Sequence, residues 1–204
     1  MDLTRISPLS DAVLEIWQPG VMAGSAVAGI LSGKYNPSGR LPVTFPYTTG
    51  QIPIYYNHRN SGRTQGMYQD IPSTPMYEFG YGLSYTAFEY SDLSIRTASG
   101  NDASIFSADE DLVATVTVTN TGKVSGKETV QWYVCDPYST ITRPVKELKY
   151  FEKQLLLPGE SRIFKFNINP LRDLGFVDEN GHRFVEKGRF DIMVGGEKVS
   201  IELR

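Results

Sequence analysis

The regular alternation of apolar and polar residues in the last hundred residues most constrains how this chain can fold. The alternation runs through five short segments separated by turn-forming residues: 112–118, 130–134, 164–168, 190–194 and 199–203. A period of two places every second side chain on one face of a β-strand. Five to seven short strands with regular turns are typical of an immunoglobulin-like, fibronectin type III-like β-sandwich. We therefore predict a mainly β fold with such a sandwich over residues 87–204.

Turn signals between these segments support the same fold. Asn180-Gly181 lies between Phe176-Val177 and Phe184-Val185, which is the strongest short-range signal for a β-hairpin. Asn120-Thr121-Gly122 ends the first alternating segment, and Leu157-Pro158-Gly159-Glu160 precedes the third.

The first 46 residues have a different pattern. Residues 12–17 form a short apolar run closed by Gln18-Pro19-Gly20, which predicts a buried strand of a parallel sheet. Residues 21–31 predict a helix with Ala23, Val27, Ile30 and Leu31 on one face and Gly33 as its stop. Residues 41–45 predict another strand, at an edge because of Pro42. One strand–helix–strand unit cannot cover both faces of its own sheet, so we interpret residues 1–46 as a partial α/β remnant.

Two irregular stretches connect these parts. Residues 47–75 follow neither period and contain many turn formers, and a loop of this length is usually functional or disordered. Residues 76–88 contain five aromatic residues and two glycines. We interpret this aromatic strap as a packed connection between two unlike parts, or alternatively as an ordinary aromatic strand within one domain. The predicted division is 1–46, 47–86 and 87–204.

Composition and charge exclude several classes of protein. With 40% hydrophobic and 21% charged residues, the 204-residue chain is globular, and its net charge of -3 argues against nucleic acid as a partner. No apolar run reaches the ~20 residues of a membrane span. The N-terminus lacks the layout of a signal peptide. Cys135 is the single cysteine, which excludes a disulfide framework and a thiolate metal site.

Two groups of polar residues are candidates for catalytic or metal sites. Asp11 and Glu15 would lie about 13 Å apart on a strand at ~3.3 Å per residue. Retaining glycosidases need carboxyl groups about 5–5.5 Å apart, so we do not expect catalysis by this pair. His182 lies beside Asp178 and Glu179, but the predicted hairpin turn already explains these residues. We expect no catalytic residue, metal or cofactor in this chain.

The segment 55–63 is the richest polar constellation in the sequence. Its aromatic rings could stack on sugar rings, while His, Asn and Arg could donate hydrogen bonds to hydroxyl groups. Tyr56, His58 and Arg59 are therefore the candidate substrate-binding residues. The alternative is a surface loop ordered by its own tyrosines.

Several long motifs resemble glycoside hydrolase family 3, which includes β-glucosidases and β-xylosidases. The closing part of that family's α/β sandwich domain is similar to segments 17–20, 33–46, 51–58 and 77–86. Its C-terminal fibronectin type III-like domain is similar to segments 120–122, 143–148 and 157–160. The resemblance runs in linear order along essentially the whole chain.

The resemblance implies retaining hydrolysis by two carboxylates, an Asp on an N-terminal barrel domain and a Glu from a sandwich-domain loop. Both lie upstream of the matched segments. The chain would therefore brace the catalytic domains of a β-glycosidase and hydrolyse nothing alone. A β-linked oligosaccharide would be bound through the full-length enzyme, whose location would be periplasmic or secreted.

Two other classes of function are also compatible with the sequence. The sandwich could be a non-catalytic carbohydrate-binding or protein-interaction module, with Tyr133 and Tyr138 facing solvent. It could also be a structural spacer or dimerisation element. The α/β motifs before the sandwich favour the glycosidase, because a free-standing module has no need of them.

Overall fold

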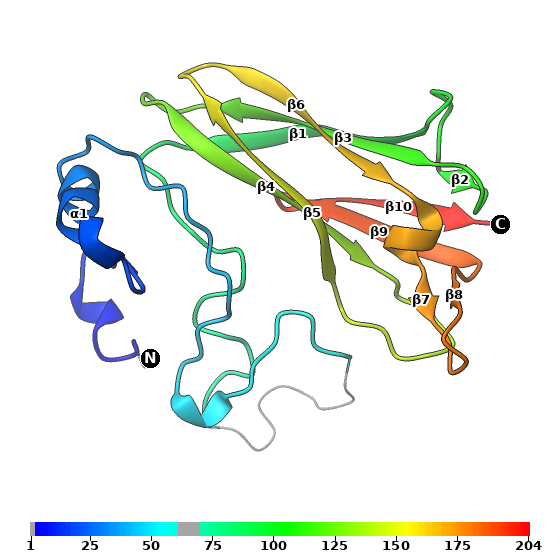
Figure 1. Cartoon of the computed structure of the whole chain (residues 1–204), viewed down its shortest axis with the longest axis horizontal. Coiled ribbons are helices and arrows are strands. Elements are labelled where there is room, and N and C mark those ends of the chain that lie inside the picture. Colours follow the sequence, from blue (N-terminus) through cyan, green and yellow to red (C-terminus); the bar gives the residue numbers. More distant parts are fainter. Residues whose placement is uncertain (1–2, 61–69) are drawn as a thin grey trace. The chain divides into compact units, whose positions relative to one another are not determined.

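The computed structural model describes residues 3–60 and 70–204 (Figure 1). Contacts divide these residues into two units, which are described separately. The first contains residues 3–56 and 70–85, and the second contains residues 57–60 and 86–204.

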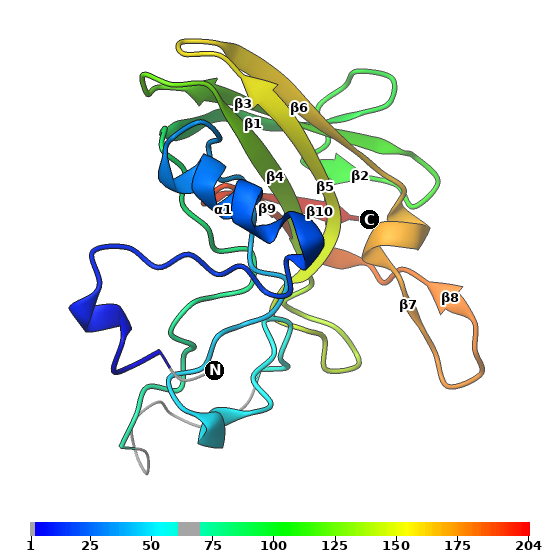
Figure 2. The same ribbon diagram turned by 60° about the vertical axis from the view of Figure 1, so that its left-hand side comes forward.

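The second unit is a β-sandwich of two main sheets (Figures 1 and 2). One sheet has the order β1-β3-β6, formed by Phe88–Thr97, Leu112–Asn120 and Ser161–Ile168. The other has the order β2-β10-β9-β4-β5, formed by Ile105–Phe106, Glu197–Leu203, Gly188–Val194, Gly126–Cys135 and Glu147–Leu156. A π-helix, η4 (Pro170–Leu174), and a small hairpin of β7 (Phe176–Val177) and β8 (Arg183–Phe184) follow β6. The predicted mainly β fold is confirmed.

The core between the two sheets contains the apolar positions of the alternating segments. Burial along β3 alternates at every residue, with Leu112, Ala114, Val116 and Val118 fully enclosed. The predicted apolar positions of β4, β6 and β9 are also buried, and Trp132, Phe164 and Phe190 are the largest fully buried side chains there. Thr129 and Asp191 are buried as well and interrupt the strict alternation in β4 and β9. The predicted inward faces of these strands are therefore confirmed.

Two long strands lie outside the alternating segments, and both are edge strands. β5 is the last strand of its sheet and has exposed or half-buried side chains along most of its length, so its sequence mixes charged and apolar residues. β1 contains a bulge between Ser91 and Ser94, where Asp92 has a φ of 55°. A bulge shifts side chains to the opposite face, which hides the period of two.

The predicted hairpin at Asn180-Gly181 is also confirmed. β7 and β8 pair antiparallel, and the turn is closed by a hydrogen bond from the Gly181 amide to the Asp178 carbonyl, 3.1 Å. Gly181 has a φ of 83°, a conformation that suits glycine.

Asn120, at the end of β3, holds the turn 120–124 together from inside the sandwich. Its fully buried side chain donates to the Val124 and Leu156 carbonyls at 2.9 and 3.0 Å. Its Oδ1 accepts from the Gly122 amide at 3.1 Å and from Thr86 Oγ1 at 2.6 Å. The Asn-Thr-Gly motif is therefore a structural device.

Replacing Asn120 by Ala is expected to lower the free energy of unfolding by about 2–3 kcal/mol, because buried carbonyls lose their donors. Urea unfolding followed by far-UV circular dichroism measures this loss. Asn101→Ala is the matched control, since Asn101 is exposed and its change should stay within about 0.5 kcal/mol. Equal effects of the two substitutions would contradict the assigned role.

The described residues of the first unit include one α-helix and residues 76–85 of the aromatic strap. Helix α1 (Ala23–Leu31) follows the 3-10 turn η2 (Gly20–Met22), and two further 3-10 turns are η1 (Ser7–Leu9) and η3 (Thr49–Gln51). The predicted helix and its end at Gly33, with a φ of 75°, are confirmed. Leu31 is exposed, however, which corrects its predicted place on the packed face.

The strap pairs with residues 41–45 through backbone hydrogen bonds. The Phe45 amide donates to the Tyr77 carbonyl, and the Leu41 amide donates to the Tyr81 carbonyl, both at 2.8 Å. A Cβ on Gly82 would lie 2.4 Å from the Gly39 carbonyl oxygen, so this approach requires glycine. Within the first unit, the strap is a packed segment rather than a free linker.

Both predicted strands of the first unit need correction. Residues 12–17 form no strand, and Val13, Ile16 and Trp17 are exposed. The predicted strand 41–45 is reduced to one bridge, between Phe45 and Tyr77. A strand needs a hydrogen-bonding neighbour along its length, and the described residues provide none for 12–17.

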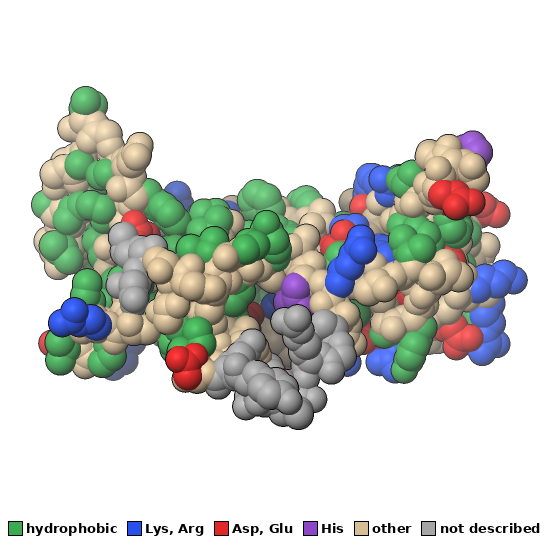
Figure 3. Space-filling model, turned by 90° about the horizontal axis from the view of Figure 1, so that it is seen from below, with side chains coloured by type: hydrophobic (Ala, Val, Ile, Leu, Met, Phe, Trp, Pro, Cys, Tyr) green, Lys and Arg blue, Asp and Glu red, His purple; other side chains and the backbone are tan. Residues whose placement is uncertain are grey.

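The first unit buries few apolar side chains. Large hydrophobic residues with less than a tenth of their surface exposed are limited, among those described, to Leu3 and Phe45, whereas the sandwich holds a cluster of twenty buried residues. Hydrophobic side chains reach the visible surface over the first unit, on the left of Figure 3, while charged side chains are concentrated over the sandwich.

We expect residues 1–75 of the isolated chain to be poorly ordered or self-associated and residues 87–204 to fold alone, because a small core cannot offset the entropy of ordering. The structure restricts this expectation by excepting residues 57–60, which belong to the second unit. Limited proteolysis with mass spectrometry should give early cuts before residue 75 and a persistent C-terminal product. Equal resistance of the N-terminal third would contradict this expectation.

Candidate functional site

The candidate loop begins with two tyrosines in the first unit. Tyr55 is exposed, whereas the Tyr56 ring stacks on Phe79 of the strap with 4.1 Å between centroids and 15° between planes. One face of Tyr56 is therefore already occupied. This packing orders the start of the loop. It agrees with the alternative interpretation of segment 55–63 as a surface loop ordered by its own tyrosines.

His58 and Arg59 belong to the second unit, where their backbone is held against the sandwich. The Val145 amide donates to the His58 carbonyl at 2.9 Å, and Arg59 forms an antiparallel bridge with Pro144. Both side chains are exposed, and His58 Nδ1 lies 3.1 Å from the Arg59 carbonyl. A fixed backbone with exposed polar side chains is a suitable arrangement for binding a polar ligand. The remaining part of the predicted segment, residues 61–63, lies outside the described residues.

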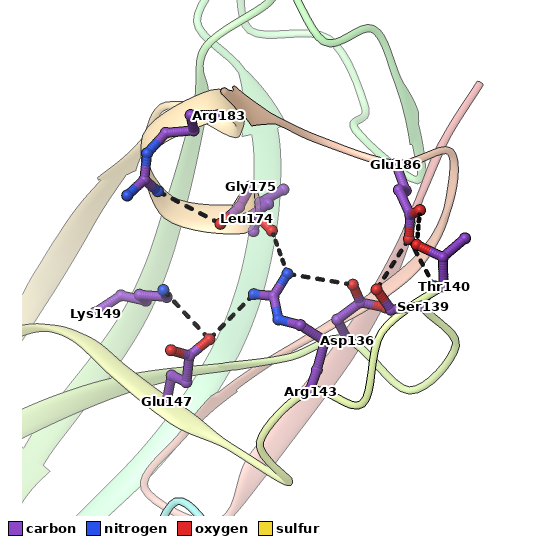
Figure 4. Close-up of polar contacts among 10 residues, drawn as sticks. All are labelled: Asp136, Ser139, Thr140, Arg143, Glu147, Lys149, Leu174, Gly175, Arg183 and Glu186. Carbon is purple, nitrogen blue, oxygen red and sulfur yellow. Dashed lines mark hydrogen bonds and ion pairs between the residues drawn. The ribbon is translucent and has the colours of Figure 1, made fainter. Parts of the chain in front are cut away.

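A buried arginine that was not among the predicted site residues directly precedes Pro144 of this bridge. Arg143, with 7% of its side chain exposed, lies 3.7 Å from Asp136 and 3.1 Å from Glu147 (Figure 4). It also donates to the Leu174 carbonyl at 3.4 Å and lies over the Phe176 ring at 5.1 Å. The guanidinium thus joins the end of β4, the start of β5 and the segment between η4 and β7.

Asp136 is the most enclosed partner of Arg143, with 4% of its side chain exposed. Burial raises the pKa of Asp136, and the positive charge of Arg143 partly opposes that rise. Glu147 is more exposed and has Lys149 as a second cation at 3.4 Å. Asp136 therefore depends more strongly on Arg143 than Glu147 does.

A second polar surface lies beside the segment that follows β4. Glu186 accepts hydrogen bonds from Ser139 Oγ at 2.9 Å, from the Thr140 amide at 3.0 Å and from Thr140 Oγ1 (Figure 4). Burial raises the pKa of Glu186, but these hydrogen bonds outweigh it and lower the pKa overall. These three residues line an open cavity of about 720 Å³ together with Pro137, Tyr138 and Lys187.

Comparison with known proteins decides the family. Residues 1–85 match the glycosyl hydrolase family 3 C-terminal domain, and residues 128–198 match the fibronectin type III-like domain. This chain belongs to glycoside hydrolase family 3. The resemblance seen in the sequence motifs is confirmed.

Curated members of family 3 match the chain over nearly its whole length. It is 39% identical to a periplasmic β-glucosidase of Salmonella typhimurium over 98% of this chain and 26% of that protein. It is 39% identical to a putative β-xylosidase of Formosa agariphila over 97% of this chain and 25% of that protein. The chain thus spans about a quarter of the length of these relatives and corresponds to their C-terminal part.

A solved structure of family 3 gives the same correspondence. The β-glucosidase of Listeria innocua, determined in complex with glucose, matches all of this chain and 29% of that enzyme, with a TM-score of 0.90 and 37% identity.

The other candidates, Asp11, Glu15 and His182, have only local contacts among the described residues. The Glu15 carboxylate accepts the Trp17 amide at 2.8 Å, and Asp11 is exposed. His182 Nδ1 lies 3.7 Å from Asp178 and is largely exposed. Within residues 3–60 and 70–204, no group of three or more His, Cys, Asp or Glu side chains could hold a metal ion. No helix of the described chain is both long and apolar enough to cross a membrane.

Proposed function

We propose that this chain serves as the C-terminal part of a retaining β-glycosidase of family 3, similar to β-glucosidases, and that it has no hydrolytic activity alone. The observation that carries this proposal is the match of the whole chain to 29% of the Listeria innocua β-glucosidase. The two carboxylates of a retaining glycosidase would then lie in the barrel and sandwich domains outside this chain. A β-linked glycoside is the proposed substrate of the longer enzyme, and its proposed location is periplasmic or secreted.

The role proposed for the chain is to brace the catalytic domains. The first unit supports this role, because it has many exposed large apolar side chains and a small core. Exposed apolar surfaces of this kind are stabilised by contact with another domain. In the proposed division, residues 1–46 complete a sandwich domain, residues 47–86 form the loop and strap, and residues 87–204 form the fibronectin type III-like domain.

Tyr56, His58 and Arg59 are proposed to contact the substrate. One ring face of Tyr56 is occupied by Phe79, while the side chains of His58 and Arg59 are exposed on a held backbone. Guanidinium and imidazole groups donate hydrogen bonds to sugar hydroxyls. This role makes the loop the part of the chain that would influence affinity for the glycoside.

A chimeric enzyme tests the proposed function directly. The part of the Listeria innocua β-glucosidase that this chain matches would be replaced by the 204-residue chain. The same enzyme truncated at that junction is the control. We expect the chimera to hydrolyse an aryl β-D-glucoside and the truncated enzyme to be inactive. A truncated enzyme as active as the chimera, or an inactive chimera with native circular dichroism and size, would contradict the proposal.

Arg59→Ala within the active chimera tests the loop. We expect KM to rise about tenfold or more with a smaller change in kcat, as removal of a binding contact predicts. Arg162→Ala is the matched control, because Arg162 pairs with Glu160 on an exposed part of the sandwich. Equal KM values for the two variants would exclude a substrate contact by Arg59.

One observation favours the alternative of a carbohydrate-binding module. Tyr138 is 76% exposed and lines the cavity beside Glu186. Tyr133, in contrast, is half-buried with Lys146 over its ring at 5.4 Å. Calorimetric titration of the chain with β-linked oligosaccharides tests this candidate, which requires binding that Tyr138→Ala abolishes.

A further inference from the structure

The loop that carries His58 and Arg59 is attached to the sandwich through a very small contact. One described backbone hydrogen bond holds it, from the Val145 amide to the His58 carbonyl at 2.9 Å. The neighbouring residue on the sandwich side is Pro144, which bridges Arg59 and has no amide to donate. The direction of the Val145 N–H therefore determines where the loop backbone is held.

The residues around this amide are fixed by the side chain of Arg143. The Arg143–Glu147 ion pair, 3.1 Å, spans the bridging residues, because one partner precedes Pro144 and the other follows Val145 by two positions. Asp136 and the Leu174 carbonyl contact the other terminal nitrogen of the same guanidinium (Figure 4). The guanidinium also lies over the Phe176 ring at 5.1 Å. These contacts come from three segments of the sandwich, so Arg143 cannot move without breaking several of them.

The backbone between Arg143 and Val145 limits how far the Val145 amide can turn. Proline fixes its own φ near −65° and restricts the residue before it, which is Arg143. With the Arg143 side chain also fixed, the chain from residue 143 to Val145 has little freedom to turn its amide away from the loop. A binding loop held in this way loses less entropy when it meets a ligand.

We infer that Arg143 is a positioning residue for the glycoside-contacting loop: it acts through the Val145 amide to hold His58 and Arg59. This inference rests on the proposed function of that loop, but its first test does not. Arg143 is buried and acts through the backbone, so it touches no substrate itself.

Hydrogen–deuterium exchange of the 204-residue chain tests the positioning step. The double variant Asp136→Asn/Arg143→Met removes the guanidinium without leaving a buried carboxylate unpaired, which limits the loss of stability of the sandwich. We expect the Val145 amide to exchange about tenfold faster, because its hydrogen bond to the His58 carbonyl is lost. Amides of β3 and β6 should change little. Arg162→Met is the control and should leave all these segments unchanged.

Two results would overturn the inference. Unchanged exchange at the Val145 amide would show that Arg143 does not hold the loop. An equal rise across the core strands would show that Arg143 stabilises the sandwich as a whole. Arg143→Lys is a second variant in case the first folds poorly, because lysine keeps the charge for Asp136 but cannot match the planar fork of arginine. It should also release the loop.

The chimeric enzyme separates this inference from the proposed function. If Arg143 acts through the loop, the combined effect of Arg143→Lys and Arg59→Ala on KM is smaller than the product of their separate effects. Independent, multiplicative effects would overturn the positioning role while leaving a substrate contact by Arg59 intact. A released loop with KM unchanged in every variant would overturn the substrate role of the loop but not its attachment through Arg143.

Discussion

Replacing Arg143 by Met is expected to lower the free energy of unfolding of the sandwich by about 3–5 kcal/mol at pH 7. The substitution leaves the carboxylate of Asp136 buried without the cation that faces it at 3.7 Å. Glu147 is affected less, because it keeps Lys149 at 3.4 Å and is partly exposed. Urea unfolding of the full chain, followed by far-UV circular dichroism, measures the loss.

The loss of the free energy of unfolding caused by Arg143→Met should depend on pH, and the direction of this dependence follows from the pKa of Asp136. The pKa of Asp136 is raised by burial, so its ionised form destabilises the fold as the pH rises through that folded pKa. Removing Arg143 raises this pKa further. The difference from the wild type is therefore largest at neutral pH and shrinks as the pH falls below the raised pKa.

Two comparisons make this prediction specific. The double variant Asp136→Asn/Arg143→Met should recover more than half of the lost free energy at pH 7, because no buried charge is left unpaired. Arg162→Met removes a more exposed arginine, whose pair with Glu160 is worth about 1 kcal/mol or less. A deficit that is independent of pH, or one that the double variant does not reduce, would contradict the role of Asp136.

Replacing Trp132 by Ala is expected to cost about 3–5 kcal/mol, since a large cavity opens in the centre of the sandwich. Trp132 is fully buried on β4, where it faces Tyr150 of β5 and Val194 of β9 across the sheet. Its ring also lies 6.0 Å from that of Phe166 on the opposite sheet. The loss is measured by urea unfolding followed by circular dichroism.

Trp132→Phe should cost much less, about 1–2 kcal/mol, for two reasons. Phenylalanine leaves a smaller cavity, and it removes the indole Nε1, a buried donor that has no partner among the described residues. Tyr138→Ala is the control, because this exposed ring should change stability by no more than about 0.5 kcal/mol. A Trp132→Ala effect as small as that of Tyr138→Ala would contradict the assigned core.

The sandwich was largely predictable because the burial of its central strands follows the local alternation of apolar and polar residues. The segments 112–118 and 130–134 alternate between buried and partly exposed side chains, so the residue type at each position indicates its burial. Edge strand β5 has no fully enclosed face over most of its length, so its residues carry no such signal. The same holds for β1, where the bulge at Asp92 changes the register.

The first unit and the anchor of the loop could not be predicted in the same way. A strand at 12–17 requires a neighbour, and an apolar run cannot show whether one is present. The pair formed by Arg143 and Asp136 joins residues seven positions apart on different segments, and it depends on how the sandwich brings them together. The i,i+4 spacing of Arg143 and Glu147 was visible in the sequence, but it gave no indication of burial.

Hydrolysis of aryl β-D-glucoside and β-D-xyloside by the purified 204-residue chain tests most directly whether this chain is the non-catalytic C-terminal part of a family 3 β-glycosidase. We expect a rate equal to that of the buffer blank. Turnover that survives repurification and is abolished by a substitution within this chain would contradict the proposed function, because an active site would then lie among these residues.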